Sequence, residues 1–158
     1  MKKVILVDGN NLLFRSYYAT AYSGNLMKNS KGFPTNGLFG FINMMNKIIH
    51  EENPNYILVA FDMGKTFRHE KYEDYKGGRD ETPNDLKIQF PIAKEILKAM
   101  GICYLEVQDY EADDIIGTYA KQIDDSNDYE GLIVSSDKDL LQLISEHNTV
   151  KLLKTKDS

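Results

Sequence analysis

Short apolar runs rich in β-branched residues alternate along this chain with longer segments in which apolar residues recur at helical spacing. Three runs, at residues 4–7, 56–61 and 132–134, are apolar at nearly every position. Such runs are typical of strands buried on both faces, as in a parallel sheet covered by helices on each side. Residues 102–107 form a weaker fourth candidate.

Helical periodicity is clearest over residues 36–52, where apolar residues recur every three or four positions. These residues are Leu38, Phe41, Ile42, Met45, Ile48 and Ile49. Thr35 is expected to cap this helix, and Asn53-Pro54 to end it.

Three further helices are expected. One begins at Thr82-Pro83-Asn84-Asp85, with the proline in the first helical position, kinks at Pro91 and ends at Gly101. Another covers about residues 112–123, and a short one begins near Lys138. Strands that alternate with helices of this length predict a single α/β domain over residues 1–158, with a doubly wound, mainly parallel sheet and helices on both faces.

Composition limits the class of protein. The 158 residues carry a formal net charge of −5, which argues against a general nucleic-acid coat. The single cysteine, Cys103, rules out an internal disulfide and is expected to be a small buried hydrophobic residue. The apolar run before Asp8 is too short for a signal peptide, and no run reaches the length of a membrane span. We therefore expect a soluble, cytoplasmic protein with no membrane partner.

Acidic residues follow every predicted strand. They are Asp8 and Asp62 at the ends of the first two strands, Glu111, Asp113 and Asp114 after the weaker strand, and Asp137 and Asp139 after the last. Because the carboxyl ends of parallel strands meet at one edge of a sheet, all seven carboxylates are expected at that edge.

Each acid also has an ordinary structural explanation. The three acids at the start of the third helix could cap it, and Asp137 could cap the fourth, since a helix N-terminus favours negative charge. Capping explains Asp8 and Asp62 less well, because both end strands predicted to be buried. Taken together, seven like charges at one edge would repel one another and raise several pKa values unless cations were bound there.

The type of ligand narrows the choice of cation. All seven side chains are oxygen donors and no cluster of cysteine and histidine lies near them, which favours Mg²⁺ or Mn²⁺ over zinc. Two such ions would change the formal charge from −5 to about −1, which removes the objection to a nucleic-acid partner. Paired divalent ions held by carboxylates are suited to displacement at phosphorus, so the sequence predicts a metal-dependent phosphodiesterase.

A basic, aromatic segment follows Asp62 at residues 64–82. It interleaves basic and aromatic side chains, a mixture suited to phosphate contacts and base stacking: Lys65, Arg68, Lys71, Lys76 and Arg79 with Phe67, Tyr72 and Tyr75. Acidic residues in the same segment leave open a solvated amphipathic helix with ion pairs at i and i+4. Because the segment leaves the acidic edge and contains Gly77-Gly78, we expect a mobile flap above the metal ions.

Four motifs in order identify a resemblance to a known family. VDGNN, FDMGKTFRHEKYEDYKGGR, YEADD and SSDKDL resemble the motifs of the 5′-3′ exonuclease (5′ nuclease) domain of bacterial DNA polymerase I, in the flap endonuclease family, over essentially the whole chain. The resemblance implies a PIN-like (resolvase-like) domain that cuts 5′ flaps and removes RNA primers in replication and repair. It also implies a flapped, nicked or primer-bearing duplex as partner, and a polymerase domain that could follow on the natural chain.

The resemblance further implies roles for single residues. The seven acids fall on metal-ligand positions, with Asp8, Asp62, Glu111 and Asp113 nearest the catalytic ion. Residues 64–82 correspond to the helical arch of the family, where basic side chains engage the scissile phosphate; Lys76 and Arg79 are therefore expected to be catalytic, together with Asp8 and Asp62. Expected DNA contacts are Arg15, Arg68, Lys71, Tyr75, Lys76 and Arg79, although an ion pair beneath the first helix is equally consistent with Arg15.

The chain also departs from the family pattern. Further metal-binding aspartates and a helix-hairpin-helix region that grips duplex DNA follow in the family, and the closing residues KLLKTKDS resemble neither, so we expect a domain fragment. Two functions stay open: a two-metal 5′ nuclease, and a catalytically incomplete piece that binds metal and single-stranded DNA without turnover. A receiver-type or phosphoryl-transfer domain is disfavoured, because no second acid of the DxD kind follows Asp8.

Overall fold

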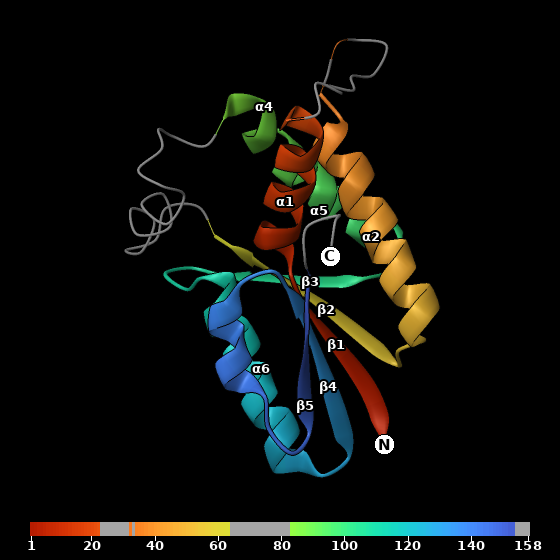
Figure 1. The fold of residues 1–158 in the computed structure, drawn as a ribbon, viewed down its shortest axis with the longest axis vertical. Coiled ribbons are helices and arrows are strands. Elements are labelled where there is room, and N and C mark those ends of the chain that lie inside the picture. The colour runs from red at the N-terminus through yellow and green to blue at the C-terminus, as the bar shows by residue number, and fades with distance from the viewer. Residues whose placement is uncertain (23–31, 33, 64–82, 154–158) are drawn as a thin grey trace.

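Five parallel strands lie between two layers of helices in the computed structural model, which describes residues 1–22, 32, 34–63 and 83–153 (Figure 1). The strands are β1 (Lys2–Asp8), β2 (Tyr56–Asp62), β3 (Cys103–Val107), β4 (Tyr129–Ser135) and β5 (Asn148–Leu152), in the order β3-β2-β1-β4-β5. Every neighbouring pair is parallel. The predicted α/β fold with a parallel sheet is therefore confirmed.

Helices cover both faces of this sheet (Figure 1). One face carries α1 (Gly9–Tyr22), α2 (Asn36–Glu52), α4 (Asn84–Lys87) and α5 (Gln89–Ala99), and the other carries α6 (Ala112–Ser126) and the 3₁₀ helix η1 (Lys138–Leu143). Each crossover between parallel strands thus contributes a helix that buries one side of the sheet.

The two edge strands account for the differences between prediction and structure in the sheet. β5 was not predicted, because its sequence NTVKL has no continuous apolar run. Cys103 is exposed, so its expected burial is wrong. It begins β3, which has a neighbouring strand on one side only.

The predicted bounds of α2 and the N-cap position of Thr35 are confirmed, but the expected side-chain cap is not made. The Thr35 side chain makes no capping hydrogen bond, while its main-chain carbonyl accepts the first helical N–H, that of Phe39, at 2.9 Å. The helix ends as expected at Asn53, which is left-handed (φ 45°) and donates its N–H to the carbonyl of Ile49.

The helix predicted from residue 82 to Gly101 is two helices. A break at Ile88 separates α4 from α5, because Pro91 has no N–H to donate to the carbonyl of Lys87. Pro83 lies one position before the helix rather than in its first turn, and Thr82 lies outside the described residues. Gly101 ends α5 in the left-handed region (φ 76°), where its N–H bonds the carbonyl of Lys98.

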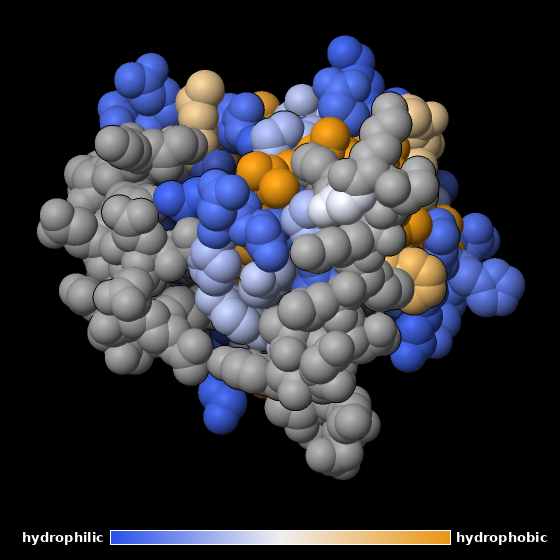
Figure 2. Space-filling view, turned by 90° about the horizontal axis from the view of Figure 1, so that it is seen from above, coloured by the Kyte–Doolittle hydropathy of each residue, from blue (hydrophilic) through white to orange (hydrophobic). Residues whose placement is uncertain are grey.

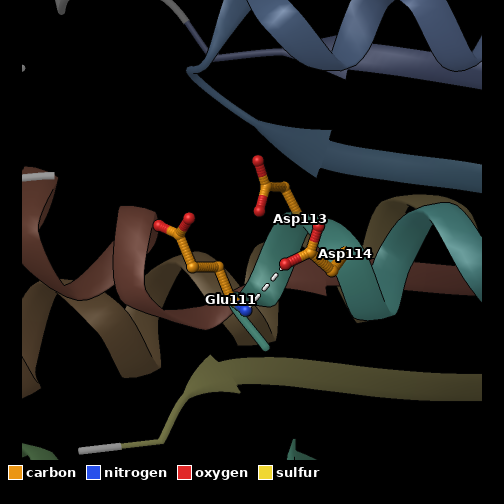
Figure 3. A group of neighbouring side chains, drawn as sticks. All are labelled: Glu111, Asp113 and Asp114. Carbon is orange, nitrogen blue, oxygen red and sulfur yellow. Dashed lines mark hydrogen bonds between the residues drawn. The ribbon is translucent and has the colours of Figure 1, made fainter. Parts of the chain in front are cut away.

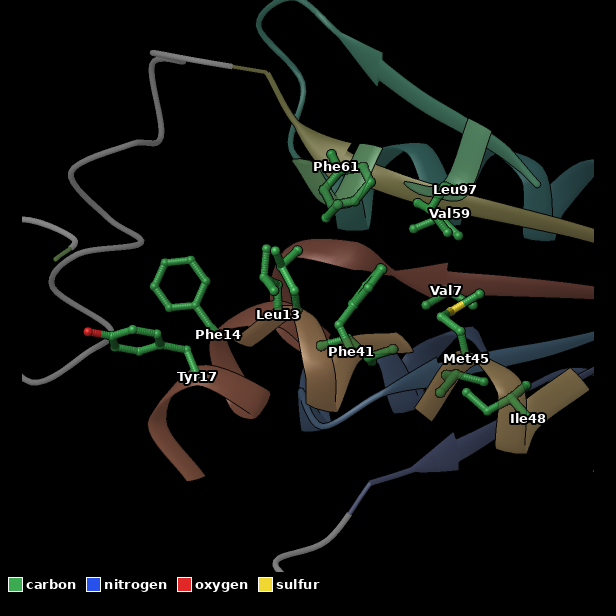
Figure 4. Packing of buried hydrophobic residues seen from close by; sticks show 14 of the residues in the cluster. Val7, Leu13, Phe14, Tyr17, Phe41, Met45, Ile48, Val59, Phe61 and Leu97 are labelled. Atoms are coloured by element: carbon green, nitrogen blue, oxygen red, sulfur yellow. The ribbon is translucent and has the colours of Figure 1, made fainter. Parts of the chain in front are cut away.

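Two hydrophobic clusters fix the central strands. On the side of α1 and α2, Phe41, Met45, Phe61 and Leu97 are fully buried, and Figure 4 shows how closely their neighbours pack. A second cluster lies beneath α6. The carboxyl ends of β1 and β2 therefore emerge from a close-packed interior that allows little movement.

The outer surface is polar over the helical layer. Figure 2 shows the described residues from above as a largely hydrophilic surface with small, separated hydrophobic groups. Among these residues, no helix combines the length and the apolar character that crossing a bilayer would need.

Candidate metal centre

Asp8 ends the central strand β1 and is buried, with an exposed fraction of 7%. Its Oδ1 accepts the N–H of Asn11 at 3.1 Å, and its Oδ2 accepts the hydroxyl of Ser135 at 3.2 Å. Burial, together with the negative charges of Asp62 and Asp113, raises the pKa of Asp8 from 3.8 to about 7 despite those two hydrogen bonds. A cation beside this carboxylate would keep it ionised at neutral pH.

Asp62 ends β2, next to β1 in the sheet. Its Oδ1 accepts the N–H of Ala112, the first residue of α6, at 2.6 Å. This hydrogen bond joins the end of one strand to the start of a helix fifty residues later in the chain.

The acids around the start of α6 lie close together (Figure 3). Glu111, Asp113 and Asp114 are half-buried, and each offers one carboxylate oxygen within 4.8 Å of the others. Glu111 and Asp114 form a capping box, in which the N–H of Glu111 donates to Oδ2 of Asp114 at 2.9 Å. The capping explanation therefore applies to Glu111 and Asp114.

Asp113 is the acid of this group whose charge raises the pKa of Asp8. In Figure 3 its carboxylate points away from the helix, whereas that of Asp114 turns back toward the main chain of Glu111. Acids from three separate elements, β1, β2 and α6, thus act on one another at the carboxyl edge.

Asp137 and Asp139 follow β4 at the same edge. Asp137 caps η1, since its Oδ1 accepts the N–H of Asp139 at 2.9 Å, while its own N–H donates to the hydroxyl of Ser135 at 3.0 Å. The capping explanation fits Asp137 here, and a metal-binding role for this pair stays a prediction.

Two asparagines that sequence reasoning left without a role hold the site together. Oδ1 of Asn10 accepts the N–H of Asp62 at 2.8 Å, and Oδ1 of Asn11 accepts both the N–H and the hydroxyl of Ser136 at 2.8 Å. The signal was present in the motif VDGNN, where two amides follow the strand-ending acid after one glycine.

Gly9 lets α1 begin immediately after Asp8. A Cβ at this position would lie 2.7 Å from Cε1 of Phe61 and 2.8 Å from Cγ1 of Val59, closer than real Cβ atoms approach. The glycine therefore permits the close contact between the start of α1 and β2 that brings both asparagines to the sheet edge.

The predicted DNA-contacting residues Arg68, Lys71, Tyr75, Lys76 and Arg79 lie in the segment 64–82, outside the described residues. Arg15 is half-buried on α1, where burial lowers the pKa of its guanidinium. Its contact with DNA stays a prediction.

The donor set fits a hard divalent cation. The acids described above are oxygen donors, and the pKa of Asp8 is near neutrality because this carboxylate is buried and, to a smaller extent, because other carboxylates lie near it. Bound positive charge would reverse that effect, since an opposite charge favours the ionised form.

Comparison with known protein families gives a match over nearly the whole chain. Residues 3–158 match the family described as 5′-3′ exonuclease, N-terminal resolvase-like domain. DNA polymerase I of Bacillus caldotenax is 47% identical over 154 residues, which make up 97% of this chain and 17% of that protein. The 5′-3′ exonuclease of Aquifex aeolicus is 43% identical over 148 residues, which make up 93% of this chain and 50% of that protein. The chain thus spans half or less of the length of these relatives.

Solved structures share the fold. Bacteriophage T5 5′-exonuclease with bound zinc superposes with a TM-score of 0.62 at 22% identity, covering 94% of this chain and 54% of that one. A T5 flap endonuclease in a pseudo-enzyme-product complex with DNA and metal ions has a TM-score of 0.62 at 19% identity, with the same coverage. At these identities the likeness establishes the arrangement of sheet and helices.

Proposed function

Because the chain belongs to the 5′-3′ exonuclease family, we propose that the acids at the carboxyl edge form the metal centre of a 5′-3′ exonuclease and 5′ flap endonuclease that hydrolyses phosphodiester bonds. The observation that carries this proposal is the buried carboxylate of Asp8, which the charges of Asp62 and Asp113 destabilise in the absence of a cation. A buried acid surrounded by like charges is costly to the fold and is expected where it holds metal.

The proposed cofactor is Mg²⁺ or Mn²⁺, with two ions in the complete protein. Asp8, Asp62, Glu111 and Asp113 would hold the ion nearest the reacting phosphate. The other proposed ligands are Asp114, Asp137 and Asp139. Bound divalent ions supply an activated water and positive charge that stabilises the phosphate in the transition state.

Three side chains of the chain are proposed to position the metal ion and the phosphate: Asp62, Lys76 and Arg79. The N–H of Ala112 holds Oδ1 of Asp62 and so fixes this carboxylate at the end of β2, beside the start of α6. On the resemblance, Lys76 and Arg79, outside the described residues, would contact the scissile phosphate and lend positive charge to it.

The proposed substrate is DNA with a 5′ flap, or a nicked or primer-bearing duplex, including its RNA primer. A T5 neighbour was solved as a flap endonuclease complex with DNA, and relatives such as the Bacillus caldotenax protein are DNA polymerases of which this chain matches 17%. We therefore also propose a polymerase domain on the natural chain.

The test is release of product from a 5′-labelled flap duplex in Mg²⁺, Mn²⁺ or chelator. The unaltered chain is compared with Asp62→Asn, whose amide oxygen can still accept the hydrogen bond of Ala112, and with the exposed control Asp128→Asn. We expect cleavage that needs metal, falls at least about 100-fold with Asp62→Asn and persists with the control. Cleavage in chelator, or full activity of Asp62→Asn, would contradict the proposal. A folded chain that binds Mn²⁺ and single-stranded DNA without cleaving would support the alternative of binding without turnover.

A further inference from the structure

The two consecutive asparagines at the start of α1 reach in opposite directions along the sheet edge. Asn10 bonds the end of β2, on one side of β1, and Asn11 bonds the residue that follows β4, on the other side. Successive residues of a helix point about 100° apart, so neighbouring positions can serve opposite strands.

The side chain of Asn10 makes a hydrogen bond to β2 beyond the point where β1 ends. β1 pairs with β2 only as far as Asp8 opposite Ala60, whereas β2 continues to Asp62. At Asp62 the chain of β1 has already turned into α1, and Oδ1 of Asn10 accepts the main-chain N–H of Asp62 at 2.8 Å. The amide thus extends the hydrogen-bond ladder to the residue that carries the acid.

Asn11 does the same on the other side. The pairing of β1 with β4 ends at Val7 opposite Val134. Beyond it, Oδ1 of the Asn11 side chain accepts the N–H and the hydroxyl of Ser136, and the main-chain N–H of Asn11 donates to Oδ1 of Asp8. One residue therefore contacts both the buried acid and the turn that leads to Asp137.

The residues that the two asparagines contact are hydrogen-bonded in turn to the acidic group. Asn10 accepts the N–H of Asp62, and the carboxylate of Asp62 accepts the N–H of Ala112 at the start of α6. The main-chain N–H of Asn11 donates to Asp8, whose carboxylate also accepts the hydroxyl of Ser135. Carboxylates that repel one another would separate if the strand ends were free, so hydrogen bonds at this edge resist that movement.

We propose that Asn10 and Asn11 are positioning residues of the metal centre: they hold the carboxylates of Asp8 and Asp62 at the spacing that a divalent ion requires. The inference rests on the proposed function. An amide suits the task because it accepts hydrogen bonds without adding another negative charge to the edge. Residues that orient metal ligands typically change metal affinity 10- to 100-fold when they are removed.

The test is Mn²⁺ binding by the whole chain, measured by electron paramagnetic resonance of free Mn²⁺, which needs no catalytic turnover. Asn10→Ala and Asn11→Ala are compared with Asn148→Ala. Asn148 is also buried and also bridges two elements, with its Nδ2 donating to the carbonyl of Ala120 at 2.9 Å, but it begins β5 at the opposite edge of the sheet. Circular dichroism in chelator establishes that each variant is folded.

We expect Asn10→Ala and Asn11→Ala to raise the dissociation constant at least about 10-fold, and Asn148→Ala to lower thermal stability while leaving Mn²⁺ affinity unchanged. Asn11→Asp keeps an oxygen acceptor for Ser136, so this variant should bind Mn²⁺ at least as tightly as the unaltered chain. It provides a test of Asn11 even if Asn11→Ala does not fold. Unchanged affinity in the folded alanine variants, equal weakening by Asn148→Ala, or an Asn11→Asp variant as weak as Asn11→Ala would overturn the inference. If the unaltered chain binds no Mn²⁺, the proposed metal centre itself fails.

Discussion

The carboxylate of Asp62 accepts the main-chain N–H of Ala112 at 2.6 Å, which ties the end of β2 to the first residue of α6. Because Glu111 and Asp113 flank Ala112, this single hydrogen bond fixes the acids of the helix relative to those of the sheet. Elements far apart in sequence are thereby brought into one acidic site whose charges act on Asp8.

The raised pKa of Asp8 predicts how stability depends on pH without metal. The folded pKa is about 7 and the unfolded value is near 3.8. Between these values the folded chain keeps a proton that the unfolded chain releases, so the free energy of unfolding falls as pH rises. The loss between pH 5 and pH 7 should be about 2 kcal/mol in chelator, measured by urea denaturation.

Asp8→Asn is the control for this pH dependence, because the amide keeps the shape of the side chain and cannot ionise. Its stability should fall less over the same pH interval, and Mg²⁺ should likewise flatten the profile of the unaltered chain. Parallel profiles for the two proteins in chelator would show that Asp8 does not carry the effect.

Replacing Gly9 with alanine should destabilise the fold. The added methyl would lie within 2.8 Å of the Phe61 ring and Val59, both fully buried, so the cost should be about 1 to 3 kcal/mol. Gly117→Ala is the matched helical control, since the nearest atom to its added Cβ among the described residues outside the helix backbone, Cδ2 of Leu143, would be 4.0 Å away. That change should stabilise by about 0.5 to 1 kcal/mol. Equal effects in thermal unfolding would count against the close contact at Gly9.

The acids should differ in their effect on metal affinity. Asp113→Asn should weaken Mn²⁺ binding at least about 10-fold, because the charge of Asp113 acts directly on buried Asp8. Asp139→Asn should have the smaller effect, since Asp139 is exposed and its main-chain N–H, which bonds Asp137, is retained. Calorimetric titration with Mn²⁺ measures both, and the reverse order would place the ion nearer η1.

Lys76→Ala should separate catalysis from metal binding. If Lys76 contacts the scissile phosphate, as the family resemblance implies, cleavage should fall by about 100-fold or more while the Mn²⁺ dissociation constant stays unchanged. Lys121→Ala, an exposed lysine on α6, is the control for loss of one positive charge. Undiminished cleavage by Lys76→Ala would favour a mechanism in which this lysine has no part, such as phosphoryl transfer to an aspartate.

The central strands could be predicted from the sequence because burial on both faces leaves a continuous apolar run, as in VILV before Asp8. The edge strand β5 could not, since one open side permits the polar residues of NTVKL. The break at Ile88 follows from the chemistry of Pro91, which has no N–H to donate to the carbonyl four residues earlier.

The acids of the candidate site could be placed at one edge from strand order in the sequence alone. The sequence could not show which of these acids cap a helix and which face a cation, because capping and metal binding use the same residue types. Only the geometry shows Asp114 and Asp137 accepting main-chain N–H groups, and Asp113 acting on Asp8. The tasks of Asn10 and Asn11 depend on where β1 stops relative to β2 and β4, which the motif does not state.

The most direct test of a metal centre at this edge is a crystal structure of the chain grown with Mn²⁺, with anomalous scattering used to locate the ion. We expect a peak within coordination distance of carboxylate oxygens of Asp8 and Asp113. A fully ordered site with no peak there, or Mn²⁺ bound only to exposed acids elsewhere, would contradict it.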